Sequence, residues 1–454
     1  MKDFDSIYFV GAGGIGMAAL ERYFLSKGKK VAGYDRTPTD LTRALEAEGV
    51  EIAFDENPDL IPSYCRDKER TLVVYTPAVP DSHAGLRWFR SEGFEVVKRA
   101  KVLGVVTEHS KGLCFAGTHG KTTTSSMAAH ILEVSGIGCN AFLGRNYGSN
   151  FLLSDSSPYS VIEADEFDRS FHQLSPYIAV ITSTDADHLD IYGNYENYLE
   201  SFAHFTELVR PGGALIVHTG LALKPRPQEG VSTYSYSLNE GDFHAANVRK
   251  GNGEIVFDFV TPTETITDIN LGVPVDINIE NAVAAMAACW LVKVPSEAMK
   301  KAIGTFMGPK RRFEFWLKED GKVVIDDYAH HPDELKASIR SVKDLYPGKK
   351  LTVIFQPHLF TRTRDFAPQF AEALSLADEL ILLPIYPARE QPIEGVTSEI
   401  ILKDVTCPNK KIYSKENLLN SIQNLNFEVL LTAGAGDIIN LLPQICEEVK
   451  KQKH

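Results

Sequence analysis

Brief apolar runs alternate with longer mixed stretches along the whole chain. Apolar runs bounded by glycine or polar residues predict buried strands, and the stretches between them predict helices, which is the order typical of parallel α/β folds. Near the N-terminus the predicted strands cover residues 7–10, 31–33, 72–75 and 95–97. This alternation predicts a small α/β domain over residues 1–107.

The same alternation predicts two more domains. In residues 108–308 the predicted strands cover 113–116, 160–162, 178–182 and 214–217, followed by an antiparallel ribbon within 254–269 and helices over 280–291 and from 296. In residues 309–454 the predicted strands cover 323–325, 351–355, 379–383 and 429–432. We therefore predict the α/β class, with three consecutive α/β domains of which the first and last are Rossmann-like.

Composition agrees with a multidomain protein. The chain has 454 residues and is 44% hydrophobic, which is more than one core usually serves. The net charge of −13 argues against nucleic-acid or anionic-membrane partners. Because no apolar run approaches the length of a membrane span and the start lacks a leader pattern, we expect a cytoplasmic protein. The six cysteines are widely spaced, so we expect reduced core residues.

A glycine-rich loop is the strongest chemical signal. It reads Gly117-Thr118-His119-Gly120-Lys121-Thr122-Thr123-Thr124 and lies between a buried strand and a helix predicted over 121–134. Backbone N–H groups and the helix dipole in such a loop converge on phosphate, which predicts ATP binding. Lys121 would neutralise the β- and γ-phosphates and the Thr122 hydroxyl would face Mg²⁺. The loop departs from the general pattern because Phe115 stands where the first glycine is expected.

A second glycine loop precedes the first predicted helix. It reads Gly11-Ala12-Gly13-Gly14-Ile15-Gly16, and Asp35 follows the next predicted strand. Close backbone approach at the start of a helix favours any diphosphate, and the carboxylate can hold a ribose-like diol. NAD and a UDP-sugar both remain admissible on these residues.

Acidic turns follow two successive strands after the phosphate loop. They read Glu163-Ala164-Asp165-Glu166 and Asp185-Ala186-Asp187-His188-Leu189-Asp190. Since both stand at carboxyl ends of strands, where open α/β sheets bind ligands, they are candidate magnesium ligands. Each turn alone could instead be an ordinary helix cap.

Polar clusters also mark the last domain. Arg311 and Arg312 lie at its start, Asp326, Asp327 and His330 follow one predicted strand, and His358, Arg362 and Arg364 follow the next. Arginines bind carboxylate or phosphate through planar donors, although a solvated charge run is the alternative for 310–312. Adjacent histidines at 330 and 331 do not have zinc-ligand spacing, so we do not expect zinc.

Taken together, these motifs resemble the Mur ligase family, the ATP-dependent amide-forming enzymes of peptidoglycan synthesis. The phosphate loop matches the family's own form, which accounts for Phe115. The alanine-adding branch is indicated by four C-terminal motifs, which read Arg311-Arg312-Phe313, Asp326-Asp327-Tyr328-x-His330-His331-Pro332, Gln356-Pro357-His358 and Tyr386-Pro387-Ala388-Arg389-Glu390-x-Pro392-Ile393. Three departures are Asn278 in place of an adenine-stacking histidine, Leu359 in place of an arginine, and no lysine between positions 121 and 224 for carbamylation.

The resemblance implies an ATP-dependent ligase that joins L-alanine to the lactoyl carboxylate of UDP-N-acetylmuramate through an acyl phosphate. Residues 1–107 would bind the UDP-sugar, 108–308 would bind ATP, and 309–454 would form the C-terminal ligase domain. We expect a monomer or weak homodimer. The alternatives are a murein tripeptide-recycling ligase on the same UDP-sugar and, on the 11–16 loop alone, an NAD-dependent oxidoreductase.

The resemblance also implies roles for individual residues. The expected catalytic residues are Lys121, His188, Arg312 and His330. The expected ATP-binding residues are Gly117, Thr118, His119, Gly120, Lys121, Thr122, Thr123, Asn281, Arg311, Arg312, Asp326 and Asp327. The expected substrate-binding residues are Gly11, Gly13, Gly14, Ile15, Gly16, Asp35, His358, Arg362 and Arg364. The expected Mg²⁺ ligands are Thr122, Glu163 and His188.

Overall fold

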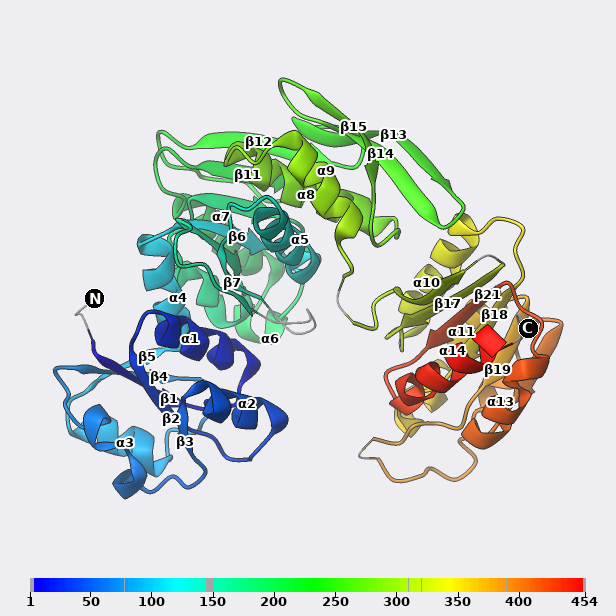
Figure 1. Ribbon diagram of the computed structural model, residues 1–454, viewed down its shortest axis with the longest axis horizontal. Helices are drawn as coiled ribbons and strands as arrows, with labels where there is room; N and C mark the ends of the chain where they lie inside the picture. The colour runs from blue at the N-terminus through cyan, green and yellow to red at the C-terminus, as the bar shows by residue number, and fades with distance from the viewer. Residues whose placement is uncertain are drawn as a thin grey trace. The chain divides into compact units, whose positions relative to one another are not determined.

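Three β-sheets with flanking helices make up the protein (Figure 1). The computed structural model describes residues 4–76, 78–143, 151–308, 310–319, 321–388 and 390–451. Contacts divide these residues into two compact units. The first unit holds the chain up to residue 246 with 258–269 and 279–306, and the second holds 247–257, 270–278 and the residues from 307 onward. The predicted α/β class is confirmed.

The first sheet is parallel throughout, in the order β3-β2-β1-β4-β5. Its strands are β1 (Ser6–Val10), β2 (Lys30–Tyr34), β3 (Glu51–Ala53), β4 (Thr71–Tyr75) and β5 (Glu95–Lys98). Its helices are α1 (Ile15–Ser26), α2 (Asp40–Glu48), α3 (Ala84–Ser91) and α4 (Arg99–Glu108), with short 3₁₀ turns at Pro58–Leu60 and Ser63–Cys65. Because β1 lies between β2 and β4, the chain reverses its winding at the end of β1, where the 11–16 loop begins.

The central sheet has ten strands in the order β15-β14-β13-β12-β11-β10-β6-β9-β7-β8. The strands are β6 (Lys111–Ala116), β7 (Asn140–Phe142), β8 (Phe151–Leu152), β9 (Tyr159–Glu163), β10 (Ile178–Ile181), β11 (Ala214–His218), β12 (Ser232–Ser237), β13 (Phe243–Gly251), β14 (Glu254–Val260) and β15 (Thr265–Asn270). The helices are α5 (Lys121–Val134), α6 (Leu189–Tyr192), α7 (Tyr195–Glu207), α8 (Ile277–Leu291) and α9 (Ser296–Thr305), with a 3₁₀ segment at Phe167–Gln173. The predicted ribbon is confirmed as the hydrogen-bonded neighbours β14 and β15.

The third sheet runs in the order β16-β17-β21-β18-β19-β20 and is parallel except for the β16–β17 pair. Its strands are β16 (Glu314–Glu319), β17 (Lys322–Asp327), β18 (Leu351–Phe355), β19 (Glu379–Leu382), β20 (Asn409–Ile412) and β21 (Val429–Ala433). Its helices are α10 (Pro332–Leu345), α11 (Phe360–Leu374), α12 (Glu399–Leu402), α13 (Lys415–Ser421) and α14 (Leu442–Lys451), with 3₁₀ turns at Ile422–Asn424 and Asp437–Leu441.

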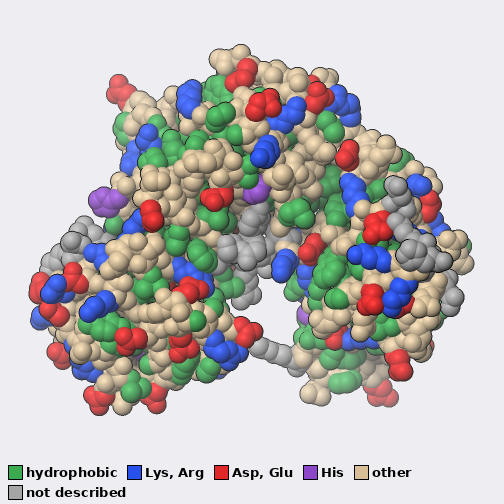
Figure 2. Space-filling model, viewed as in Figure 1, with side chains coloured by type: hydrophobic (Ala, Val, Ile, Leu, Met, Phe, Trp, Pro, Cys, Tyr) green, Lys and Arg blue, Asp and Glu red, His purple; other side chains and the backbone are tan. Residues whose placement is uncertain are grey.

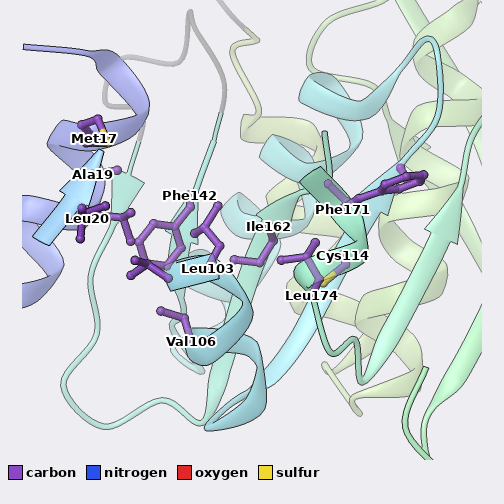
Figure 3. Close-up of a cluster of buried hydrophobic side chains, with 14 of the residues drawn as sticks. Met17, Ala19, Leu20, Leu103, Val106, Cys114, Phe142, Ile162, Phe171 and Leu174 are labelled. Carbon is purple, nitrogen blue, oxygen red and sulfur yellow. The ribbon is translucent and has the colours of Figure 1, made fainter. Parts of the chain in front are cut away.

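One apolar core joins the first sheet to the central sheet. Met17 and Leu20 of α1 lie beside Phe142 and close to Leu103 of α4, and the cluster continues through Ile162 of β9 (Figure 3). This shared core explains why residues 1–107 and most of residues 108–308 fall in one compact unit, while 247–257 and 270–278 belong to the other. All six cysteines are buried and unpaired, as the sequence predicts.

Charges of both signs are interspersed over the face shown in Figure 2. Among the described residues, no helix is both long and apolar enough to cross a membrane.

Candidate active site

The 117–124 loop connects β6 to α5, as predicted, and its two glycines are required by the backbone. Gly117 has φ of 145°, and a Cβ there would lie 2.1 Å from Thr182 Oγ1. Gly120 has φ of 83° and occupies the position before the first residue of α5. Left-handed φ values and such close approaches exclude other side chains without strain. The loop is held further by the His119 N–H, which donates to Ser183 Oγ at 2.7 Å.

Phe115 is fully buried in β6 and pairs with Glu163 of β9. The strand runs on to Ala116, so the tight turn begins only at Gly117. A glycine at position 115 would therefore lie inside a buried strand, where it would cost core packing. This geometry explains why the loop departs from the general motif.

The ammonium of Lys121 is held within the loop. It donates to Gly117 O at 2.5 Å and to Glu166 Oε1 at 2.9 Å. The Glu166 side chain is only 2% exposed, and burial raises the pKa of this carboxyl group, against the lowering effect of Lys121. The sequence pointed to the acidic turn but did not identify Glu166 as the partner of Lys121, because spacing alone does not say which carboxylate of a turn faces the loop.

Two of the three predicted metal ligands lie together. The Thr122 hydroxyl donates to Glu163 Oε1 at 2.8 Å, which places a hydroxyl and a carboxylate at the start of α5. Such hard oxygen donors suit Mg²⁺. Within the described parts of the chain, no group of three or more histidine, cysteine, aspartate or glutamate side chains could hold a metal by itself.

His188, the third predicted ligand, immediately precedes α6 in a left-handed conformation with φ of 50°. Its Nε2 lies 3.7 Å from Asp187 Oδ2, and its ring packs edge-on against Phe167 with centroids 5.3 Å apart. A non-glycine residue in this conformation is uncommon and often marks a functional position. Its role as a metal ligand stays a prediction.

Asn281 of α8 lies against the phosphate-loop helix. Thr124 Oγ1 donates to Asn281 Oδ1 at 3.2 Å, and a Cβ at Gly120 would lie 2.9 Å from the same oxygen. Two further residues of the loop are also placed by the structure. Thr118 Oγ1 bonds to Tyr198 Oη at 2.8 Å, and Thr123 belongs to the first turn of α5. Asn281 is therefore adjacent to the predicted ATP site.

The 11–16 loop opens α1, as predicted, and Asp35 fastens it. The Gly13 N–H donates to Asp35 Oδ2 at 2.7 Å, and the Thr37 N–H donates to Asp35 Oδ1 at 3.2 Å. A Cβ at Gly13 would lie 2.9 Å from both Asp35 and Thr42. Each carboxylate oxygen keeps a second lone pair, so Asp35 can hold the loop and still accept a hydrogen bond from a diol.

A pocket of about 360 Å³ lies between the start of α1 and the acidic turn after β9. Its lining includes Gly14, Ile15, Gly16, Met17, Thr76, Arg99, Phe142, Leu143, Glu163 and Asp165. Residues predicted for the diphosphate site and a residue predicted for the metal site thus share one cavity of the first unit. Arg99 begins α4 and belongs to no recognisable motif, so it could not be predicted from the sequence.

In the second unit, Arg311 is committed to internal contacts. Its guanidinium donates to Asp326 Oδ2 at 2.9 Å and to the carbonyl oxygens of Gly434 at 2.5 Å and Gly436 at 3.2 Å. Thr432 Oγ1 donates to Asp326 Oδ1 at 2.6 Å, as the β17–β21 register requires. This buried network favours a positioning role for Arg311 and Asp326.

Asp327 and Arg312, which adjoin Asp326 and Arg311 in the sequence, are arranged differently. Asp327 accepts hydrogen bonds from the Ala329 N–H at 2.8 Å and from Ser338 Oγ at 3.1 Å, and burial raises its pKa to about 6. Arg312 is exposed. Of the two adjacent arginines, Arg312 is thus the one available to an external anion.

His330, His358 and Arg362 lie close together. The rings of His330 and His358 have centroids 6.1 Å apart, and His358 stacks on Tyr386 at 5.7 Å. Among described atoms, His358 Nδ1 and Arg362 Nη1 are buried without a hydrogen-bond partner. Burial lowers the pKa of His358, and the adjacent Arg362 lowers it further. Arg362 Nη1 is a donor whatever the pH, so its lack of a partner points to an anionic ligand.

Arg364, also predicted to bind substrate, is separated from this cluster. Two positions along α11 from Arg362, it points away from it and pairs with Asp365 Oδ1 at 2.7 Å. Arg389, part of a predicted motif, lies outside the described residues.

Three family models match consecutive parts of the chain. They are "Mur ligase family, catalytic domain" over residues 6–111, "Mur ligase middle domain" over 115–289 and "Mur ligase, glutamate ligase domain" over 311–444. The chain belongs to the Mur ligase family. The predicted family is thus confirmed, and the oxidoreductase alternative is set aside.

Individual relatives are similar over nearly their full length. The UDP-N-acetylmuramate--L-alanine ligase of Phocaeicola vulgatus is 60% identical, covering 98% of each chain. The crystal structure of a UDP-N-acetylmuramate-alanine ligase from Thermotoga maritima matches with a TM-score of 0.73 at 26% identity, covering 98% of this chain and 99% of that one. A murein peptide ligase from Psychrobacter arcticus shares the fold, with a TM-score of 0.58 at 20% identity and 98% coverage of both chains.

Proposed function

We propose that this chain is an ATP-dependent ligase that joins L-alanine to the lactoyl carboxylate of UDP-N-acetylmuramate in the synthesis of peptidoglycan precursors. One observation carries the proposal: the diphosphate-type loop at Gly14–Met17 and Glu163, which bonds to Thr122 of the phosphate loop, line the same pocket. A sugar nucleotide held by the first loop would present its carboxylate near the ATP phosphates. The 60% identity to a relative named for this reaction supports the same substrates.

In the first step, a carboxylate oxygen attacks the γ-phosphorus, ADP leaves, and an acyl phosphate forms. Two anions must meet, so neutralising charge is the main requirement. Lys121 and the N–H groups of the phosphate loop would hold the phosphates, and Arg312 would add a second positive charge. Arg311 would fix the backbone next to Arg312 through its bond to Asp326.

Thr122 and Glu163 would hold Mg²⁺, with His188 as a further proposed ligand. Their 2.8 Å hydrogen bond brings a hydroxyl and a carboxylate oxygen together, a donor set that fits this ion. Bound Mg²⁺ supplies charge neutralisation for phosphoryl transfer. The contribution of these residues is to fix the oxygens at the start of α5.

In the second step, the amine of L-alanine attacks the acyl carbon, and phosphate leaves from the tetrahedral intermediate. The unpartnered Nη1 of Arg362, which lies next to His358, would bind the amino-acid carboxylate. His330, next to His358, and His188 are the candidate bases for the amine proton.

A phosphate-release assay tests the proposal. Purified protein is given ATP, Mg²⁺ and UDP-N-acetylmuramate, with L-alanine, glycine, L-serine or the murein tripeptide in parallel. We expect release that depends on both the UDP-sugar and L-alanine, and an amide product in mass spectrometry. Release only with the tripeptide would instead support the recycling ligase, and release indifferent to any amino acid would refute a ligase.

A further inference from the structure

Arg99 is placed against the start of α1. A Cβ built on Gly16 would lie 2.6 Å from Arg99 Nη1 and 3.1 Å from its Cζ, so the guanidinium occupies the space that a side chain at position 16 would need. Arg99 lines the 360 Å³ pocket together with Gly14, Ile15 and Gly16. A glycine at position 16 is therefore required for the arginine to reach the loop.

The charge of Arg99 has no direct partner. Among the described residues, no oxygen accepts a hydrogen bond from its guanidinium, and no carboxylate forms an ion pair with it. Asp165 and Glu163 act on it only from a distance, and burial lowers the pKa of Arg99. An arginine usually makes several charge-assisted hydrogen bonds when removed from bulk water, so its open donors point to a ligand.

The same corner of the pocket carries a backbone donor. Gly16 is the second residue of α1, a position whose N–H has no acceptor within the helix, whereas the Met17 N–H donates to Gly14 O at 2.9 Å. The positive end of the helix dipole adds to this donor set. By contrast, the Gly13 N–H already donates to Asp35, so it is not among the open donors.

We propose that Arg99 binds the diphosphate of the sugar nucleotide, together with the backbone N–H of Gly16. This inference rests on the proposed function and assigns a residue to it. A guanidinium can donate to two phosphate oxygens at once, and it adds a full positive charge where the helix dipole supplies only part of one. The lactoyl carboxylate would then lie toward the Glu163 end of the pocket, next to Thr122.

Binding of three ligands by calorimetry tests this assignment. UDP and UDP-N-acetylglucosamine carry the diphosphate without the lactoyl carboxylate, whereas UDP-N-acetylmuramate carries both. For Arg99→Gln we expect affinity to fall roughly 10- to 100-fold for all three ligands, as for loss of a charge-assisted contact. Arg99→Lys should recover only part of it, because an ammonium lacks the planar fork. The Michaelis constant for ATP should stay within about twofold, which shows that the ATP site is intact, and an unchanged melting temperature shows that the variant is folded.

Arg43→Ala is the matched control, because this arginine of α2 is exposed and pairs with Asp40 on the same helix at 2.6 Å. It should bind all three ligands like the wild type. A loss confined to UDP-N-acetylmuramate would overturn the assignment, since Arg99 would then contact the carboxylate. Unchanged binding by Arg99→Gln would also overturn it while leaving the proposed function intact. A wild-type protein that binds none of the three ligands would overturn both.

Discussion

Asp327 should make the second unit less stable as the pH rises from about 4 to about 6. Its carboxyl group is buried and its pKa is raised from 3.8 to about 6, chiefly by burial. The native state therefore binds a proton that the unfolded chain has released between these values. Because stability falls with pH wherever the native state binds more protons, the free energy of unfolding decreases over this range and levels off above it.

The size of the effect follows from the two pKa values. A difference of about two pH units corresponds to about 3 kcal/mol at most, and local opening of the site would reduce it. Asparagine has nearly the same shape and does not titrate. Its side-chain oxygen can still accept from the Ala329 N–H, which now donates to Asp327 Oδ1 at 2.8 Å. Asp327→Asn should thus remove the pH dependence with little change in packing.

Urea unfolding followed by tryptophan fluorescence can isolate this unit. The chain has three tryptophans, and only Trp316 lies in the second unit, on β16 beside β17. A Trp88→Phe, Trp290→Phe background therefore reports on the sheet that carries Asp327. The quantity to follow is the difference in unfolding free energy between this background and the same background with Asp327→Asn, from pH 4 to 7.5.

Relative to the Asp327→Asn variant, the Asp327 protein should lose up to about 3 kcal/mol of unfolding free energy between pH 4 and 6.5. Above pH 6.5 the difference between the two should stay constant. Asp404→Asn, at an exposed position of the same unit, serves as the control and should show no such change. A difference independent of pH, or one that grows in favour of Asp327 as the pH rises, would refute this reasoning.

Three further predictions concern the first unit. Lys121→Ala should lower kcat at least about 100-fold, for a loss of about 3 kcal/mol of transition-state stabilisation, and near-normal ADP release would contradict its role. Glu163→Gln should raise the Mg²⁺ concentration for half-maximal activity about tenfold, since a neutral amide binds the ion less well than a carboxylate; an unchanged requirement would remove Glu163 from the metal site. Gly104→Ala should destabilise the unit by about 1–3 kcal/mol, because the new Cβ would lie 2.1 Å from Gln173 O; an unchanged melting temperature would contradict the packing of α4 against 167–173.

Most strands predicted from the sequence have apolar residues that are buried on both faces, although β5 was predicted and has no fully buried residue. The run at 113–116 is an example, since β6 lies between β10 and β9 and its apolar residues are fully buried. The helix predicted over 121–134 agrees with α5 at both ends, because a glycine loop precedes it and Gly136 follows. In both cases the local pattern and the tertiary environment demand the same structure.

Short strands and strands of polar residues could not be predicted in the same way. β3 has only three residues and none is fully buried, and β12 is a run of serine, threonine and tyrosine. Such strands are stabilised by pairing with a neighbour already in place rather than by their own hydrophobic pattern. The sequence carries little local signal for them.

In the candidate site, too, some residues could be predicted from the sequence and others could not. Residues of motifs, such as Lys121, Thr122 and Glu163, could be predicted because strand ends and helix starts bring them to one sheet edge. The involvement of Glu166 and Arg99 depends on how two separate segments pack, which spacing does not encode. The internal contacts of Arg311 could not be predicted either: its motif indicated a ligand contact, which stays a prediction, and the structure adds bonds to Asp326 and to two backbone carbonyls.

The acidic turn after β9 contacts both the proposed triphosphate site and the proposed sugar-nucleotide site. Glu163 and Glu166 bond to Thr122 and Lys121, which are consecutive residues at the start of α5. Asp165, between them, lines the pocket that holds Arg99. The turn is itself fixed to the phosphate-loop strand, since the Ala164 N–H donates to Phe115 O at 2.9 Å. A displacement of this turn would therefore disturb the triphosphate and sugar-nucleotide sites together. Substitutions in the turn should change the Michaelis constants for both ATP and the UDP-sugar, whereas substitution of Arg99 should change only the constant for the UDP-sugar.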